Sequence, residues 1–109
     1  MKRVLIAGAT GYLGRHLVTD FRAHGWYVIA LVRSATKARR AGLEADAMIE
    51  GEATRPADLA GIMDGVNLVV SALGITRQKD GLSYRDVDFH ANANLLTEAE
   101  RAGVGRFAY

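Results

Sequence analysis

The sequence contains no cysteine, which excludes disulfide bonds, thiolate nucleophiles and cysteine metal sites. This composition is compatible with a reducing compartment, and we expect the protein in the cytoplasm. No apolar run approaches the roughly 20 residues that a membrane span needs, so no membrane partner is expected. A secretion signal is not expected either, because Gly8, Gly11 and Arg15 interrupt the apolar residues near the start.

The chain also lacks an excess of charge of either sign. Its 14 basic and 12 acidic residues give a formal net charge of +2, which by itself indicates neither a nucleic-acid nor a membrane partner. The basic residues are not interleaved with aromatic residues, so nucleic-acid binding is not expected. A composition that is 50% hydrophobic and 24% charged is typical of an ordinary globular protein, and we expect one domain over residues 1–109.

Short apolar runs alternate with segments of helical period, which is typical of parallel strands joined by crossover helices. The runs that we expect as strands are residues 4–7, 27–32, 47–49, 66–72 and 106–109. Three of them are almost continuously apolar, as strands buried on both faces require. Right-handed crossovers then predict an α/β fold, a doubly wound parallel sheet with strand order 3-2-1-4-5. We expect the fifth strand to be truncated and the chain to be the N-terminal fragment of a longer protein.

Four segments lie between these strands. The first predicts a helix that Gly25 ends, with an apolar face made of Leu13, Leu17, Val18 and Phe21. Residues 33–45 form either a short basic helix or a loop. A third helix is predicted from residues 54–56 to Gly65. The longest helix ends at Gly103, and one of its faces carries Val87, Ala91, Leu95, Ala99 and Ala102.

Three glycines follow the first expected strand, where the first helix begins, in the segment Gly-Ala-Thr-Gly-Tyr-Leu-Gly of residues 8–14. Gly8 allows a tight turn, Gly11 allows a pyrophosphate to approach the backbone, and Gly14 allows close helix packing. The N–H groups of the first helical turn then face the phosphates, aided by the helix dipole. We therefore expect this segment, with Thr10, Tyr12 and Leu13, to bind a dinucleotide. The alternative is a loop that serves only the turn and the packing.

The Gly-x-x-Gly-x-x-Gly spacing and several later segments resemble the extended and atypical branches of the short-chain dehydrogenase/reductase superfamily. The similar segments are residues 4–11, 51–52, 66–74, 87–89, 92–96 and 102–107. The resemblance runs along nearly the whole chain and implies a Rossmann-type fold with a bound NAD(P). It identifies no substrate. Asn92 and Asn94 also match the family, and we expect them to pack or hydrogen-bond near the sheet.

The residue after the second expected strand indicates which dinucleotide is bound. An acidic residue there would hydrogen-bond the ribose hydroxyls and repel a 2′-phosphate, but the sequence has Arg33. A guanidinium can pair with the phosphate through its planar fork, and Lys37 adds a charge nearby. We therefore predict NADP(H) as the cofactor in preference to NAD(H). The alternative is a solvated basic surface.

The resemblance implies two further cofactor contacts. Glu52 stands where the family often has an acidic residue, usually aspartate, beside the adenine amino group. Ala72, Leu73 and Gly74 correspond to the family's small-residue turn beside the cofactor. The residues themselves leave two alternatives open. Glu52 is then a solvated surface residue, and the small side chains at 72–74 only relieve crowding at the end of the strand.

No catalytic residue and no metal site are predicted. The superfamily usually relies on a Tyr-x-x-x-Lys pair, and none of the four tyrosines has a lysine four residues later. The three histidines share no metal-ligand spacing. An NADP-dependent oxidoreductase or an epimerase/dehydratase acting on a small molecule is the favoured function of the longer protein. The alternatives are a non-catalytic dinucleotide-binding regulator or assembly factor, and an interaction module without a ligand. Self-association through the exposed edge of the last strand is expected.

Overall fold

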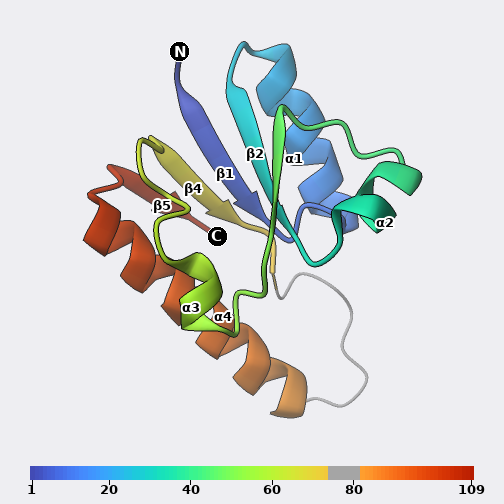
Figure 1. The fold of residues 1–109 in the computed structure, drawn as a ribbon. Coiled ribbons are helices and arrows are strands. Elements are labelled where there is room, and N and C mark those ends of the chain that lie inside the picture. Colours follow the sequence, from blue (N-terminus) through green and yellow to red (C-terminus); the bar gives the residue numbers. More distant parts are fainter. Residues whose placement is uncertain (74–81) are drawn as a thin grey trace.

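The computed structural model describes residues 1–73 and 82–109 and contains a five-stranded parallel sheet (Figure 1). The order β3-β2-β1-β4-β5 confirms the predicted topology. The strands are β1 (Arg3–Ala7), β2 (Tyr27–Val32), β3 (Ala47–Glu50), β4 (Leu68–Ser71) and β5 (Arg106–Ala108). Each lies within two residues of the predicted limits at either end.

Helices cover both faces of the sheet, and the sheet separates the core into two hydrophobic clusters (Figure 1). One face carries α1 (Tyr12–Ala23) and α2 (Ala35–Arg40), and the other carries α3 (Pro56–Leu59) and α4 (Leu82–Ala102). Neighbouring residues of one strand enter opposite clusters: Leu5 packs on the α4 side and Ile6 on the α1 side, and both are fully buried. This two-sided burial explains the continuous apolar runs.

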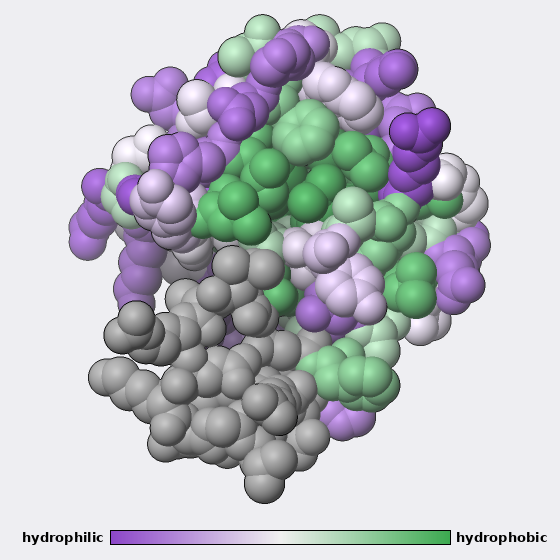
Figure 2. Space-filling model, turned by 180° about the vertical axis from the view of Figure 1, so that it is seen from behind, coloured by the Kyte–Doolittle hydropathy of each residue, from purple (hydrophilic) through white to green (hydrophobic). Residues whose placement is uncertain are grey.

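The α1 side of β4 is less well covered. Helix α1 packs on β1 and β2, whereas Leu68 and Val70 of β4 are only half-buried. Figure 2, which shows the back of the view in Figure 1, has hydrophobic side chains gathered on the exposed surface of this side.

Helix α1 ends as predicted, at a Gly25 with a φ of 84°. Its apolar face is shorter than predicted, because Leu13 is 40% exposed while Val18 is buried. Leu13 lies in the first turn of α1, directly after the glycine loop that follows β1. The segment 33–45 contains the helix α2, which begins when the Ser34 hydroxyl accepts a hydrogen bond from the Lys37 N–H.

The predicted third helix is wrong in length. It stops at Leu59, because Ala60 is extended (ψ 121°) and Gly61 has a φ of 79°. Leu59 and Met63 are nevertheless both buried in the cluster beneath α4. Their spacing thus reflects burial of an irregular segment and not a continuous helix.

A charged network fastens this irregular segment to α4. Glu98, 8% exposed, accepts the Gly61 N–H at 3.1 Å and the guanidinium of Arg101 at 2.6 Å. Arg101 also pairs with Asp64 at 2.8 Å. The hydrogen bond from Arg101 lowers the pKa of Glu98 although burial acts to raise it, and the Gly61 N–H adds to the lowering. Glu98 in turn raises the pKa of Arg101.

Helix α4 ends after Ala102, where Gly103 has a φ of 72°, as predicted. Its buried face contains Ala91, Leu95 and Ala99. Within residues 1–73 and 82–109, no helix combines the length and the apolar character that crossing a membrane requires.

Candidate functional site

The predicted site residues come together at one edge of the sheet. Residues 8–14 follow β1, Arg33 follows β2, Glu52 lies two residues beyond β3, and Ala72 and Leu73 follow β4. These strands are parallel, so the loops after their carboxyl ends lie along the same edge (Figure 1). The chain runs from β1 outward to β2 and β3, and then returns to place β4 on the other side of β1. Open α/β sheets bind ligands at such a switch in strand order, here between β1 and β4. Gly74 lies outside the described residues.

Two of the three loop glycines are required by the fold itself. Gly8 has a φ of 73°, and a Cβ there would lie 3.0 Å from the carbonyl carbon of Ala72. A Cβ on Gly14 would lie 2.0 Å from the carbonyl oxygen of Gly8. The loop after β1 therefore touches the turn after β4 on one side and the start of α1 on the other.

Gly11 is different, because the protein leaves room for a side chain at this position. Its φ is −73°, and the nearest atom to an added Cβ is the Gly8 carbonyl oxygen at 3.5 Å, an ordinary contact. Neither backbone strain nor crowding within the described structure requires glycine here. The open space beside Gly11 fits a group that approaches the loop from outside the chain, as a diphosphate would.

The start of α1 offers hydrogen-bond donors to such a group. Gly11 is the N-cap residue and supplies no side-chain cap, and Arg15 is the first residue whose N–H bonds back to the helix, to the Gly11 carbonyl at 2.9 Å. Among the described residues, the N–H groups of Tyr12, Leu13 and Gly14 have no hydrogen-bond acceptor. No acidic residue lies in this first turn. Free N–H groups and the positive end of the helix dipole favour an anion.

Three side chains of this segment face solvent. Thr10 is exposed, Leu13 is 40% exposed and Tyr12 is 77% exposed. The ring of Tyr12 packs edge-on against His16, with 4.6 Å between the ring centroids. These side chains are therefore accessible to a ligand above the loop.

The basic residues after β2 are also exposed. Arg33 immediately follows the strand, and Lys37 lies in the first turn of α2. Within the described part of the chain, neither side chain forms an ion pair. Their charges are thus available at the edge where the adenosine ribose of a dinucleotide would lie.

Glu50 is a carboxylate at this edge that is not among the predicted site residues. It ends β3, lies opposite Val32 in the register of β2 and β3, and accepts the N–H of Ala35 at 2.9 Å. The available signal was a glutamate that ends an otherwise apolar run, but the sequence does not show that β3 ends opposite Val32, at the end of β2.

The loop after β3 is fixed against α3. The N–H of Glu52 donates to the Asp58 carboxylate at 3.0 Å, and the Glu52 carboxylate pairs with Arg55 at 3.2 Å. A Cβ on Gly51 would lie 3.2 Å from the Cβ of Asp58, so the loop passes close to the helix. Glu52 is half-buried, and its carboxylate already has a cationic partner in Arg55.

The turn after β4 is fixed by buried polar groups. The Ser71 hydroxyl donates to the side-chain oxygen of Asn92 and accepts the N–H of Leu73 at 3.3 Å. The N–H of Ala72 donates to the Ala7 carbonyl at 2.9 Å. Asn94 donates to the Ala53 carbonyl at 2.9 Å, so both asparagines of α4 have the predicted hydrogen-bond role.

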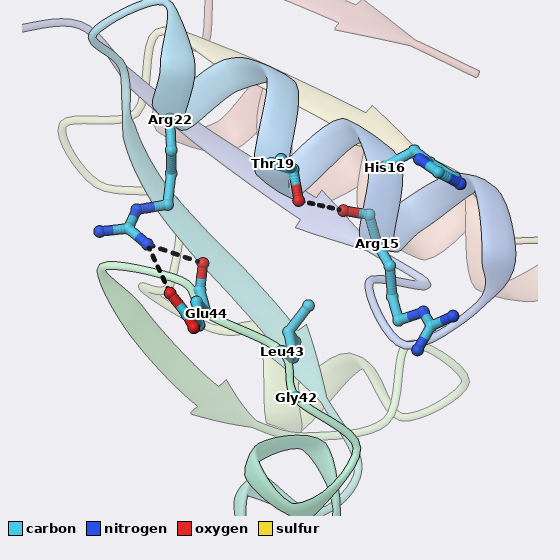
Figure 3. A pocket seen from close by; sticks show the side chains of 7 residues that line it. All are labelled: Arg15, His16, Thr19, Arg22, Gly42, Leu43 and Glu44. Carbon is cyan, nitrogen blue, oxygen red and sulfur yellow. Dashed lines mark hydrogen bonds and ion pairs between the residues drawn. The ribbon is translucent and has the colours of Figure 1, made fainter.

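A separate hollow of about 430 Å³ lies between α1 and the loop after α2 (Figure 3). Figure 3 shows Arg15 and Arg22 projecting from α1 toward this loop, and Arg22 pairs there with Glu44 at 3.8 Å and with Asp46 at 3.5 Å. The hollow contains none of the predicted cofactor-binding residues, and we assign it no binding role.

Comparisons with known proteins agree with this geometry. A family model described as NAD(P)H-binding matches residues 8–109. The photosystem II assembly factor Ycf39 of Synechocystis is 32% identical over 107 residues, which cover 98% of this chain and 32% of that protein. A 3 beta-hydroxysteroid dehydrogenase/Delta 5→4-isomerase of Mycobacterium tuberculosis is 31% identical over 116 residues, which cover 98% of this chain and 30% of that protein.

Among solved structures, the Bordetella bronchiseptica enzyme WbmG in complex with NAD is similar, with a TM-score of 0.77 and 25% identity. The match covers 96% of this chain and 36% of that one. The chain thus spans about a third of the length of the curated relatives that it matches.

Proposed function

Since this chain belongs to the NAD(P)H-binding family, we propose that it binds NADP(H) in preference to NAD(H) at the carboxyl edge of its sheet. The chain is an NAD(P)-binding Rossmann domain of the kind found in short-chain dehydrogenases and epimerases, as the sequence predicted. Our proposal goes further in that it assigns a preference for the 2′-phosphorylated dinucleotide. This preference rests on Arg33, which directly follows β2.

The open space at Gly11, beside free N–H groups, carries the proposed placement. The diphosphate lies against the loop of residues 8–14, including Thr10, Tyr12 and Leu13, where the first turn of α1 provides donors. Glycine at position 11 keeps the backbone accessible. The packing of the fold already requires glycine at positions 8 and 14. A bound ligand is therefore needed to explain glycine only at position 11.

The adenosine half lies toward β2 and β3. Arg33 pairs with the 2′-phosphate through its guanidinium, and Lys37 contributes a second positive charge. Glu52 lies near the adenine amino group, provided that its ion pair with Arg55 leaves one carboxylate oxygen free. The turn of Ala72, Leu73 and Gly74 lies beside the cofactor on the β4 side. When bound, the nicotinamide ring supplies hydride transfer.

For the whole protein we propose an oxidoreductase or an epimerase/dehydratase that acts on a small molecule. The relationship to a steroid dehydrogenase and to an enzyme that binds NAD supports this class. A second candidate is a dinucleotide-binding assembly factor or regulator without catalysis, which the 32% identity to Ycf39 favours. A Tyr-x-x-x-Lys pair in the complete protein, together with NADPH-dependent turnover of carbonyl compounds or sugar nucleotides, would favour the enzyme.

Titration calorimetry with NADPH and NADH tests the cofactor proposal directly. We expect NADPH to bind more tightly, and 2′,5′-ADP to compete more strongly than 5′-AMP, because both differences isolate the 2′-phosphate. Equal affinities, or a preference for NADH, would contradict the NADP(H) assignment while leaving the dinucleotide site intact. Absence of binding by all four compounds would contradict the site itself.

We also propose that the edge strand β5 mediates self-association. It is one of the two terminal strands of the sheet, pairs with β4 alone, and leaves its other edge without a partner in the described structure. Unpaired strand edges favour pairing with another chain. Light scattering over a range of protein concentrations should show a growing dimer fraction, and a constant monomer mass would contradict this.

A further inference from the structure

The carboxylate of Glu50 lies beside the end of β2 although it belongs to β3. In the parallel register, Glu50 is opposite Val32, the residue before Arg33. Its Oε2 accepts the N–H of Ala35, two residues after Arg33, at 2.9 Å. The N–H of Gly51 donates to the Val32 carbonyl at 2.9 Å, which fixes the backbone on both sides of this contact.

The alternation of β3 explains the direction of the side chain. Met48 packs in the α1–α2 cluster together with Ala30 and Val32, whereas Ile49 packs on the opposite side. Glu50 therefore has the same orientation as Met48 and projects to the face on which α2 begins. An apolar residue would complete the cluster here. A glutamate instead extends to the first N–H of α2.

The charge of Glu50 is not neutralised within the described structure. Its side chain is exposed and accepts the backbone N–H of Ala35, and no lysine or arginine of the described residues forms an ion pair with it. A carboxylate in this state can accept a hydroxyl hydrogen bond and repels a phosphate. In Rossmann domains, an acidic residue that reads the ribose hydroxyls lies near the end of the second strand. In this chain the third strand provides a carboxylate beside the end of the second, opposite Val32 and bonded to the Ala35 N–H.

We propose that Glu50 is a specificity-determining residue of the dinucleotide site, which accepts a ribose hydroxyl of NAD(H) and repels the 2′-phosphate of NADP(H). This inference rests on the proposed binding of a dinucleotide at the carboxyl edge of the sheet. Arg33 and Glu50 then have opposite effects on the same part of the ligand. The preference for NADP(H) is the difference between them and is smaller than Arg33 alone would give.

The variant Glu50→Gln tests this, because glutamine keeps an oxygen that can accept the Ala35 N–H and loses only the charge. We expect the ratio of NADPH to NADH affinity, measured by calorimetry, to rise about tenfold, since one charged hydrogen bond is lost and one repulsion is removed. The ratio for 2′,5′-ADP over 5′-AMP should rise in parallel. Glu100→Gln, which removes an equal charge from the exposed surface of α4, should leave both ratios within about twofold of the wild type.

Glu50→Thr provides a second uncharged variant with a residue that favours strands, in case glutamine disturbs the start of α2. It should raise the ratio in the same direction. Ratios that stay within twofold of the wild type in both folded variants, or that fall, would overturn the role of Glu50 alone. If the wild type bound no dinucleotide at all, the proposed site and this inference would both be overturned.

Discussion

The hydroxyl of Ser71, the last residue of β4, donates a hydrogen bond to the side-chain oxygen of Asn92 in α4. Ser71 is 3% exposed, and the same hydroxyl accepts the N–H of Leu73. A Cβ added to Gly8 would lie only 3.1 Å from the backbone nitrogen of Leu73. A side chain in the middle of α4 thus determines how the turn after β4 meets the glycine loop.

Replacement of Asn92 by alanine should therefore destabilise the protein. The buried Ser71 hydroxyl loses its acceptor, which costs about 1–3 kcal/mol. Urea denaturation of the wild type, Asn92→Ala, Ser71→Ala and the double variant measures the coupling between the two side chains. We expect the double variant to be more stable than the sum of the single effects predicts, because removing both partners leaves no orphaned group. Strict additivity would contradict the contact.

The glycine loop predicts a contrast between two alanine substitutions. Gly14→Ala places a Cβ 2.0 Å from the Gly8 carbonyl oxygen, so we expect a loss of about 2–3 kcal/mol or more in unfolding free energy. Gly11→Ala meets only an ordinary contact at 3.5 Å and should cost less than about 1 kcal/mol. Dinucleotide binding should nevertheless weaken strongly in Gly11→Ala and disappear in Gly11→Val.

Circular dichroism and thermal unfolding separate these outcomes from binding. The circular dichroism spectrum of Gly11→Val should remain close to that of the wild type. Retained binding by a folded Gly11→Val variant would mean that the loop serves only the turn and the packing, as the alternative interpretation of the sequence holds.

Arg33→Asp should reverse the cofactor preference. Loss of one charge-assisted contact with the 2′-phosphate weakens NADPH binding by about 1.5–3 kcal/mol, or roughly ten- to more than a hundredfold. The introduced carboxylate can also accept a ribose hydroxyl of NADH. Calorimetry on Arg39→Asp, an equal charge change on the exposed surface of α2, is the control and should leave the order of affinities unchanged. An unchanged order in Arg33→Asp would exclude Arg33 as the phosphate contact.

Acid stability should depend on Glu98. Since its pKa is lowered in the folded state, its stabilisation is complete above its ordinary pKa of 4.5 and is lost as the pH falls below that value. Glu98→Gln should be less stable than the wild type by about 1–2 kcal/mol at pH 7. This gap should narrow below pH 4.5, where the wild-type carboxyl takes up a proton.

Thermal unfolding between pH 3 and pH 7 provides the measurement for this dependence. Glu100→Gln, an exposed position on the same helix, should show no such gap. A gap of constant size across this range would show that the interaction of Glu98 with Arg101 does not depend on ionisation of the carboxyl.

Much of the fold is predictable because each buried strand appears in the sequence as a short apolar run. Val4 to Ala7 and Tyr27 to Val32 are continuously apolar, and such runs occur where helices cover both faces of a parallel sheet. Glycines with positive φ mark where α1 and α4 end. The predicted length of the third helix is wrong because apolar spacing reports burial and not the conformation of the backbone. The spacing of Leu59 and Met63 records burial, and an irregular segment under α4 buries both residues as well as a helix would.

The site is predictable where one short segment contains its signal, as residues 8–14 do. It is not predictable where two strands must first be aligned. Glu50 lies 17 positions after Arg33, and only the register of β2 and β3 brings its carboxylate to the Ala35 N–H. The contact between Glu98 and Gly61 spans 37 residues and depends on how α4 crosses the sheet.

The unequal demands on the three loop glycines have a consequence for how this loop can diverge. Gly8 and Gly14 are needed before any ligand arrives, since backbone atoms occupy the space of their side chains. A homologue that gave up the nucleotide but kept the fold would be free to vary at the position of Gly11 and not at the other two. An alanine, serine or larger residue there, between two retained glycines, would identify members of the family in which the domain persists as a scaffold.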